Sequence, residues 1–140
     1  MNKPYNAFIG RYQGNHKGHM TIFSKYLDQN EPILIMVRDV PTDEKNPFTA
    51  DEVKLLWEKV YLKEVENGLV KVIIIPDIAS VNYGRGVGYL VSEIKVDLNV
   101  ANISASEIRS KIKNNDNSWK EFVDESIHED LEKLLKKNEL

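Results

Sequence analysis

Two histidines close in sequence, His16 and His19, are the residues of this chain best suited to chemistry. They belong to the stretch GRYQGNHKGH at residues 10–19. The apolar run at residues 5–9 predicts a strand before this stretch. A helix is predicted after it, because one apolar face recurs at Met20, Ile22, Phe23, Tyr26 and Leu27. The two imidazoles therefore fall where a strand passes into a helix.

This position favours the binding of anions. The first turn of a helix presents unpaired N–H groups and the positive end of the helix dipole. Arg11 and Lys17 add full positive charges, and Gly18 lets the backbone approach a ligand closely. The residues predict a phosphate site. A second interpretation stays open for this motif alone, namely a loop-to-helix junction in which one histidine caps the helix and the other packs.

Three segments, in order along the chain, carry a resemblance to a known family. Residues 10–19 resemble the GRFQPxHxGH signature of the HxGH-type nucleotidyltransferases. The stretch NPFTA at 46–50 is similar to their NPFTAGER segment, and ISASEIR at 103–109 is similar to ISGTEIR. The chain is most similar to the archaeal-type nicotinamide-mononucleotide adenylyltransferases. The resemblance implies transfer of AMP from ATP to a phosphorylated acceptor, with nicotinamide mononucleotide as the first candidate, and release of pyrophosphate.

The resemblance also implies which residues act. No cysteine and no Gly-x-Ser-x-Gly elbow is present, so direct transfer without a covalent intermediate is expected. Donors would stabilise the charge that develops on the phosphates. The expected catalytic residues are His16, His19 and Arg109. The expected nucleotide-binding residues are Gly10, Arg11, Tyr12, Lys17, Gly18, Ser104, Ser106 and Arg109.

For the third segment a purely structural interpretation also exists, in which Ser104 only caps a helix and Arg109 is a surface charge.

Mg²⁺ is expected to arrive with the substrate phosphates, since no dedicated metal cage is visible. The acceptor is assigned to Arg38, Asp39 and Arg85. The stretch around Arg85, Gly84–Gly88, lacks the dinucleotide-binding spacing and is either a turn or a ligand-binding loop.

The chain departs from the family at two places. Gly14 replaces the usual proline of the first signature, and the Ser-Gly-Asn-Pro segment expected between Ile75 and Ile103 is missing. The acceptor therefore stays open. Two alternatives are kept: a CTP-dependent cytidylyltransferase acting on a small phosphorylated alcohol, and a sensor that binds nucleotides without reaction.

The positioning elements are predicted to alternate between strands and helices. Apolar runs at 32–37 and 70–75 predict strands buried on both faces, and alternation at Leu90–Val96 predicts an edge strand. Capping-box spacings predict helices starting at Thr49 and Ser104. Apolar residues from Trp119 to Leu135 have helical spacing. The expected fold class is α/β, a Rossmann-like three-layer sandwich with a parallel sheet of four to five strands.

Length and composition limit the number of domains and the classes of partner. The chain has 140 residues, 41% of them hydrophobic, which fits one domain over 1–140. The formal net charge of -3 argues against nucleic acid or an anionic membrane as a partner, so ATP and a small phosphorylated metabolite are the expected partners. No signal or membrane-length apolar segment is seen, and a cytoplasmic location is expected. A homo-oligomer is left open. Trp57 and Trp119 are expected in the core.

Overall fold

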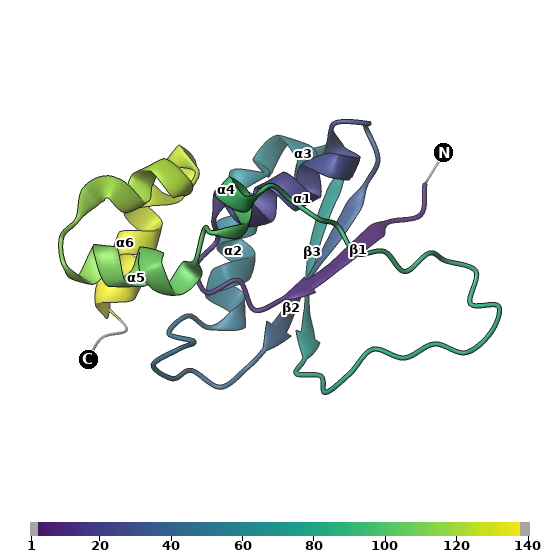
Figure 1. The fold of residues 1–140 in the computed structure, drawn as a ribbon, viewed down its shortest axis with the longest axis horizontal. Helices are drawn as coiled ribbons and strands as arrows, with labels where there is room; N and C mark the ends of the chain where they lie inside the picture. The colour runs from purple at the N-terminus through teal and green to yellow at the C-terminus, as the bar shows by residue number, and fades with distance from the viewer. Residues whose placement is uncertain (1–2, 138–140) are drawn as a thin grey trace.

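A parallel three-stranded sheet organises the molecule (Figure 1). The computed structural model describes residues 3–137. Strands β1 (Asn6–Gly10), β2 (Ile33–Asp39) and β3 (Val70–Pro76) lie in the order β1-β2-β3. All three strands therefore end at the same edge of the sheet, and the segment that carries the paired histidines leaves this edge directly after β1.

Three helices cover one face of the sheet: α1 (Lys17–Leu27), α2 (Ala50–Val60) and α3 (Leu62–Glu66). Helices α1 and α2 connect successive strands in the same direction, and right-handed crossovers of this kind lie on the same face. The burial of β2 agrees, because Ile33, Ile35 and Val37 are fully buried whereas the alternating Leu34 and Met36 are only partly buried.

Local signals in the sequence explain where α2 begins. The Thr49 hydroxyl accepts the Glu52 N–H at 3.1 Å, and the Glu52 carboxylate accepts the Thr49 N–H at 2.9 Å. This is the predicted capping box, which satisfies two N–H groups that the helix itself leaves free. Helix α2 then buries Val53, Leu56 and Trp57 against the sheet and the C-terminal helices.

The C-terminal part forms a separate group of helices packed on α2 (Figure 1). It consists of α5 (Ala105–Lys113), η1 (Asn117–Phe122), η2 (Glu125–Ile127) and α6 (His128–Lys137), whereas the preceding α4 (Leu98–Ala101) packs on α1. The predicted continuous helical spacing beyond Trp119 is interrupted, because Asp116 and Asp124 cap the new starts of η1 and η2.

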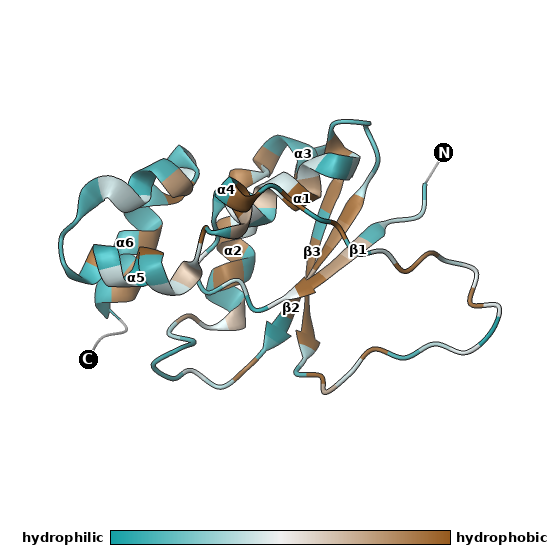
Figure 2. Ribbon diagram, viewed as in Figure 1, coloured by the Kyte–Doolittle hydropathy of each residue, from teal (hydrophilic) through white to brown (hydrophobic). Residues whose placement is uncertain are grey.

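The core lies between the sheet, α1, α2 and the C-terminal helices. Figure 2 shows apolar residues along the strands and the inward sides of the helices. Trp57 and Trp119 are 0% and 1% exposed, so the prediction that both belong to the core is confirmed. No helix among residues 3–137 is long and apolar enough to cross a membrane.

The prediction of a fourth strand at Leu90–Val96 is wrong for this structure. Residues 77–97 form a long loop without regular structure, and three strands rather than four to five make up the sheet within residues 3–137. The helices of residues 3–137 lie on one face of the sheet, so this part of the chain has two layers where three were expected. Alternation in sequence specifies which side of a strand is apolar, but a strand also needs a partner edge, and the loop makes no ladder.

Candidate nucleotide-binding site

The two histidines form a reciprocal cap at the start of α1. The His16 Nδ1 accepts the Gly18 N–H at 3.0 Å, and the His19 Nδ1 accepts the His16 N–H at 3.2 Å. Their rings stack with centroids 3.7 Å apart and planes inclined by 17°. Imidazoles thus take the roles that a serine and a glutamate play in a capping box. The interpretation of the motif as a helix cap is therefore correct. Within residues 3–137 the cap uses the Nδ1 atom of each ring, and the Nε2 atoms make no hydrogen bond.

The hydrogen bonds fix the form of both rings. Because each Nδ1 accepts a backbone N–H, a neutral ring must carry its proton at Nε2. Burial lowers the pKa of His16 to about 4. Burial, and next the neighbouring His16, lowers the pKa of His19 to about 3. At neutral pH the site therefore presents two adjacent Nε2–H donors held by the backbone.

Glycines allow the rings to take these places. A Cβ at Gly18 would lie 2.7 Å from the His16 Cε1 atom, so a side chain there would displace the cap. A Cβ at Gly10 would lie 2.8 Å from the Tyr12 ring. Gly10 and Gly18 were expected to bind the nucleotide. In the structure, the absence of a side chain at each position leaves space for an aromatic ring, Tyr12 at Gly10 and His16 at Gly18.

Tyr12 lies inside the molecule, not at an open surface. Its ring is 6% exposed and packs edge-on against His19 at 4.9 Å and Trp57 at 5.5 Å between centroids. Its backbone adopts a left-handed conformation with φ of 52°, which turns the chain after Gly10. Burial raises the pKa of the Tyr12 hydroxyl. Tyr12 was expected to bind the nucleotide. In the structure its buried ring packs against the His19 ring and so supports it.

Gln13 connects the three motif segments, and the sequence analysis did not single it out. Its Nε2 donates to the Phe48 carbonyl at 3.0 Å, and its Oε1 accepts the Phe48 N–H at 2.9 Å. Its own carbonyl accepts a hydrogen bond from Arg109. One residue of the first segment thus holds the backbone of the second segment and the guanidinium of the third. Its match to the glutamine of the GRFQPxHxGH signature is the signal that sequence reasoning could have used.

Asn15 supports the same turn from within. With its amide oriented to satisfy both groups, its oxygen accepts the Trp57 Nε1–H at 3.1 Å and its nitrogen donates to the Tyr12 carbonyl at 3.3 Å. The side chain is 1% exposed. Buried polar groups need such partners, and these bonds tie the turn between β1 and α1 to helix α2.

Two arginines supply positive charge without a compensating carboxylate. Burial lowers the pKa of Arg109, and the positive charge of Arg11 lowers it further. Neither guanidinium takes part in the ion pairs found within residues 3–137. Two like charges held near one another are unfavourable until an anion joins them. The pair is therefore the candidate anion site of this segment.

The start of α5 adds hydroxyl groups. The Ser104 and Ser106 hydroxyls lie 2.9 Å apart, and Ser104 accepts the Glu107 N–H at 3.5 Å. Ser104 is the N-cap, and α5 runs from Ala105, as the capping signal predicted. The purely structural interpretation is correct in that Ser104 caps α5. It is wrong for Arg109, which is half-buried and hydrogen-bonded and is not a free surface charge.

The remaining predicted residues are more dispersed. Lys17 is exposed at the first position of α1, and Asp39 is exposed at the end of β2. Arg38 pairs with Asp77 at 2.6 Å. Arg85 lies in the exposed loop after β3. The structure thus joins Arg109 to the histidine segment through the Gln13 carbonyl, and it places Arg85 on a separate exposed loop.

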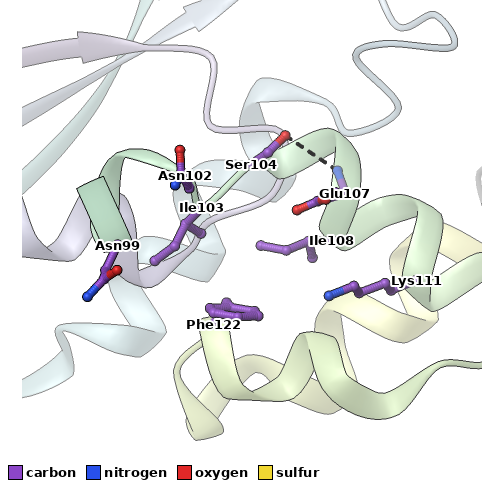
Figure 3. Close-up of a pocket in the computed structure, with 8 residues that line it drawn as sticks. All are labelled: Asn99, Asn102, Ile103, Ser104, Glu107, Ile108, Lys111 and Phe122. Carbon is purple, nitrogen blue, oxygen red and sulfur yellow. Dashed lines mark hydrogen bonds between the residues drawn. The ribbon is translucent and has the colours of Figure 1, made fainter. Parts of the chain in front are cut away.

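A small cavity lies on the other side of α5 (Figure 3). Its volume is about 230 Å³. Glu107, Ile108 and Lys111 line it from α5, whereas Arg109 leaves the helix on a different face to reach Gln13. The cavity and the candidate phosphate site therefore lie on different faces of α5 and share Ser104 at the start of this helix. Its remaining lining residues are Asn99, Asn102, Ile103, Ser104 and Phe122.

The parallel sheet, the histidine-capped helix at its carboxyl edge and the unpaired guanidiniums define an α/β domain of the nucleotidyltransferase class. No protein-family model matches the chain. Curated relatives do. The chain is 30% identical to nicotinamide-nucleotide adenylyltransferase 1 of Sulfolobus acidocaldarius, over 86% of this chain and 84% of that protein. It is 26% identical to the nicotinamide-nucleotide adenylyltransferase of Sulfurisphaera tokodaii, over 91% and 90%.

A third relative, the nicotinamide-nucleotide adenylyltransferase of Thermoplasma acidophilum, is 38% identical over 44% of this chain and 36% of that protein. The chain belongs to the archaeal-type nicotinamide-nucleotide adenylyltransferase family, which is a family of enzymes. The resemblance inferred from the three segments is thereby confirmed.

Proposed function

We propose that the chain transfers the AMP group of ATP to nicotinamide mononucleotide and releases pyrophosphate. The observation that carries this proposal is the pair of Nε2–H donors on His16 and His19, in the segment whose Gln13 carbonyl holds Arg109; within residues 3–137 neither Arg109 nor Arg11 has an ion-pair partner. The names of the relatives support nicotinamide mononucleotide as the acceptor.

The reaction would be a direct displacement. An oxygen of the acceptor phosphate forms a bond to the α-phosphorus of ATP, and the bond from that phosphorus to the bridging oxygen of the β-phosphate breaks. The bonding electron pair leaves on pyrophosphate. The attacking phosphate is already ionised, so no general base is required. Neutral imidazoles are therefore suited to donate from Nε2 to phosphate oxygens on which charge accumulates.

The cations and the α5 start would hold the distal phosphates. Arg109 offers a planar fork of donors, and Arg11 and Lys17 add charge on the same side of the α1 start. Ser104 and Ser106 add hydroxyl groups. No group of three or more His, Asp or Glu side chains that could hold a metal is found within residues 3–137, so Mg²⁺ would come with the triphosphate.

For the acceptor phosphate we retain Arg85 as the candidate cation. Arg38 is less available, because its Nε and one terminal nitrogen already bond the Asp77 carboxylate at 2.9 and 2.6 Å. Asp39, at the end of β2, would approach the sugar hydroxyls rather than a phosphate, because its charge has the wrong sign for an anion.

A product assay tests the proposal. The purified chain is incubated with Mg²⁺ and with each pairing of ATP or CTP with nicotinamide mononucleotide or glycerol phosphate, and pyrophosphate and the coupled product are measured. We expect the dinucleotide with ATP and nicotinamide mononucleotide. Turnover only with CTP and glycerol phosphate would establish a cytidylyltransferase. Nucleotide binding in a thermal-shift assay with no pyrophosphate from any pairing would establish a sensor.

The acceptor assignment has its own test. We expect Arg85→Ala to raise KM for nicotinamide mononucleotide at least tenfold and to leave the Kd of ATP within a factor of three. Lys95→Ala, which removes another exposed cation of the same loop, is the matched control. Equal KM values for the two variants would remove Arg85 from the acceptor site.

A further inference from the structure

The turn between β1 and α1 is buried along its middle. Residues 12–16 are all buried, although a connection between two elements normally runs over the surface. Side-chain hydrogen bonds, described above, hold Gln13 and Asn15 in this turn. Gly14 lies between these two residues and has no side chain with which to bond. Its place therefore depends on what packs against it.

Gly14 packs against two side chains from distant parts of the chain. A Cβ atom at Gly14 would lie 3.1 and 3.3 Å from the two methyl carbons of Leu131 and 3.6 Å from the Phe48 Cε2 atom. Leu131 is 1% exposed and Phe48 is 0% exposed, so both side chains are enclosed by the core. The backbone of Gly14 does not adopt the left-handed conformation that favours glycine. The contact with Leu131, rather than the backbone conformation, therefore favours glycine at this position.

Leu131 belongs to α6, which also supports the helix that carries Arg109. Figure 1 shows α5 and α6 side by side, and the two helices pack on each other. Next to Leu131, the Asp130 carboxylate and the Lys59 ammonium form an ion pair at 2.6 Å that joins α6 to α2. Helix α6 thus contacts α5 and, through Leu131, the turn before α1.

The hydrogen bond between Arg109 and the turn depends on the position of Gly14. The Gln13 carbonyl that accepts this bond belongs to the same peptide unit as the Gly14 nitrogen and Cα. A peptide unit is planar and rigid, so a displacement of Gly14 also displaces the carbonyl oxygen. Arg109 reaches this oxygen from α5, which packs on α6. Helix α6 therefore supports both the donor side and the acceptor side of the bond.

We propose that Leu131 is a positioning residue for the nucleotide site. Its contact with Gly14 sets the place of the Gln13–Gly14 peptide unit, and this unit sets the place of the Arg109 guanidinium. Position 14 is also where the chain departs from the first family signature, and Leu131 fills the space that a larger residue would take. Charged hydrogen bonds depend on geometry, so a displaced guanidinium holds a phosphate less well. This effect on binding rests on the function proposed above.

A mutant cycle tests the proposal in the full chain. Gly14→Ala adds one carbon atom, and Leu131→Ala removes both methyl carbons that this atom would approach. We measure the Kd of a non-hydrolysable ATP analogue, and kcat, at a temperature at which circular dichroism shows every variant folded. Gly14→Ala should raise the Kd at least fivefold in the wild-type background and leave kcat within threefold. In the Leu131→Ala background it should change the Kd less than twofold, because the added carbon has room.

Leu135→Ala is the matched control, because Leu135 lies one turn further along α6 and is equally buried, at 1% exposure. In this background Gly14→Ala should keep its fivefold effect. In the Arg109→Ala background the effect should disappear, since the guanidinium that it displaces is absent. An unchanged Kd with a lowered Tm would show a merely structural role and overturn the proposal, as would equal effects in all four backgrounds. If Leu131→Ala does not fold, Leu131→Val and Leu135→Val replace the two alanine variants.

Amide hydrogen exchange tests the same contact without a ligand. The Phe48 N–H bonds the Gln13 side chain and reports on the turn, whereas the Ile35 N–H in the central strand β2 reports on global unfolding. Leu131→Ala should accelerate exchange at Phe48 at least tenfold more than at Ile35, and Leu135→Ala should accelerate both equally. The same ratio in the two variants overturns the proposal. The expected exchange in a chain that binds no ATP would support the contact and contradict the proposed function instead.

Discussion

Replacing His19 by asparagine separates the structural role of this ring from its chemical role. The His19 Nδ1 accepts the His16 N–H, and its Nε2–H is the donor that we assign to a substrate phosphate. An asparagine oxygen at the Nδ1 position keeps the cap, whereas nothing then occupies the Nε2 position. Removal of one preorganised donor of this kind costs about 10²–10³ in kcat, or about 2.7–4 kcal/mol.

Steady-state kinetics and nucleotide titration give the measurement. We expect His19→Asn to lower kcat at least a hundredfold, to change the Kd of ATP less than fivefold and to leave Tm within a few degrees of the wild type. His19→Gln, whose amide nitrogen reaches nearer to the Nε2 position, should recover part of kcat. The reasoning is refuted if His19→Asn keeps kcat within threefold, or if kcat falls only in proportion to lost folded protein.

Three further outcomes follow from the site. Arg109→Ala should weaken binding of a non-hydrolysable ATP analogue about tenfold to a hundredfold, because it removes a charged hydrogen bond. Lys113→Ala on the same helix should leave the Kd of the analogue unchanged, and titration calorimetry measures both values. Burial holds the pKa of His16 at about 4 and that of His19 at about 3, below 6.5 in the unfolded chain. Stability should therefore be complete above pH 6.5 and fall towards pH 4 by roughly 2–3 kcal/mol per histidine in urea unfolding, and a flat profile would contradict neutral rings. Gln13→Leu leaves a buried N–H and C=O of Phe48 without partners, and it should lower the free energy of unfolding by about 1–3 kcal/mol for each group; an unchanged Tm would show that the link is not needed.

Much of the fold could be predicted because local chemistry decides it. The apolar runs ended within two residues of the ends of β1, β2 and β3, and the Thr49–Glu52 pair marked the start of α2. These signals need only neighbours in sequence. The prediction of a strand at Leu90–Val96 was wrong for the opposite reason. A strand forms only where a distant segment offers a partner edge, and alternation in sequence does not supply that edge.

The candidate site shows the same division. Types and spacing were sufficient to identify the family, because three segments matched it in order, and the roles of His16, His19 and Arg109 stay predictions. They could not show that Tyr12 is buried behind His19, or that Gln13 holds Phe48 and Arg109, since both facts depend on packing between distant segments. The acceptor side is least predictable, because Arg85 lies on an exposed stretch of a loop without regular secondary structure.

Isotope-labelled ATP tests the central claim most directly. The wild-type chain is given Mg²⁺, nicotinamide mononucleotide and ATP labelled at either the α- or the γ-phosphate, and the products are separated by chromatography. Displacement at the α-phosphorus predicts that the α label enters the dinucleotide and the γ label appears only in pyrophosphate. Transfer of the γ label to the acceptor, or release of the γ label as inorganic phosphate with the α label left in ADP, would contradict the account.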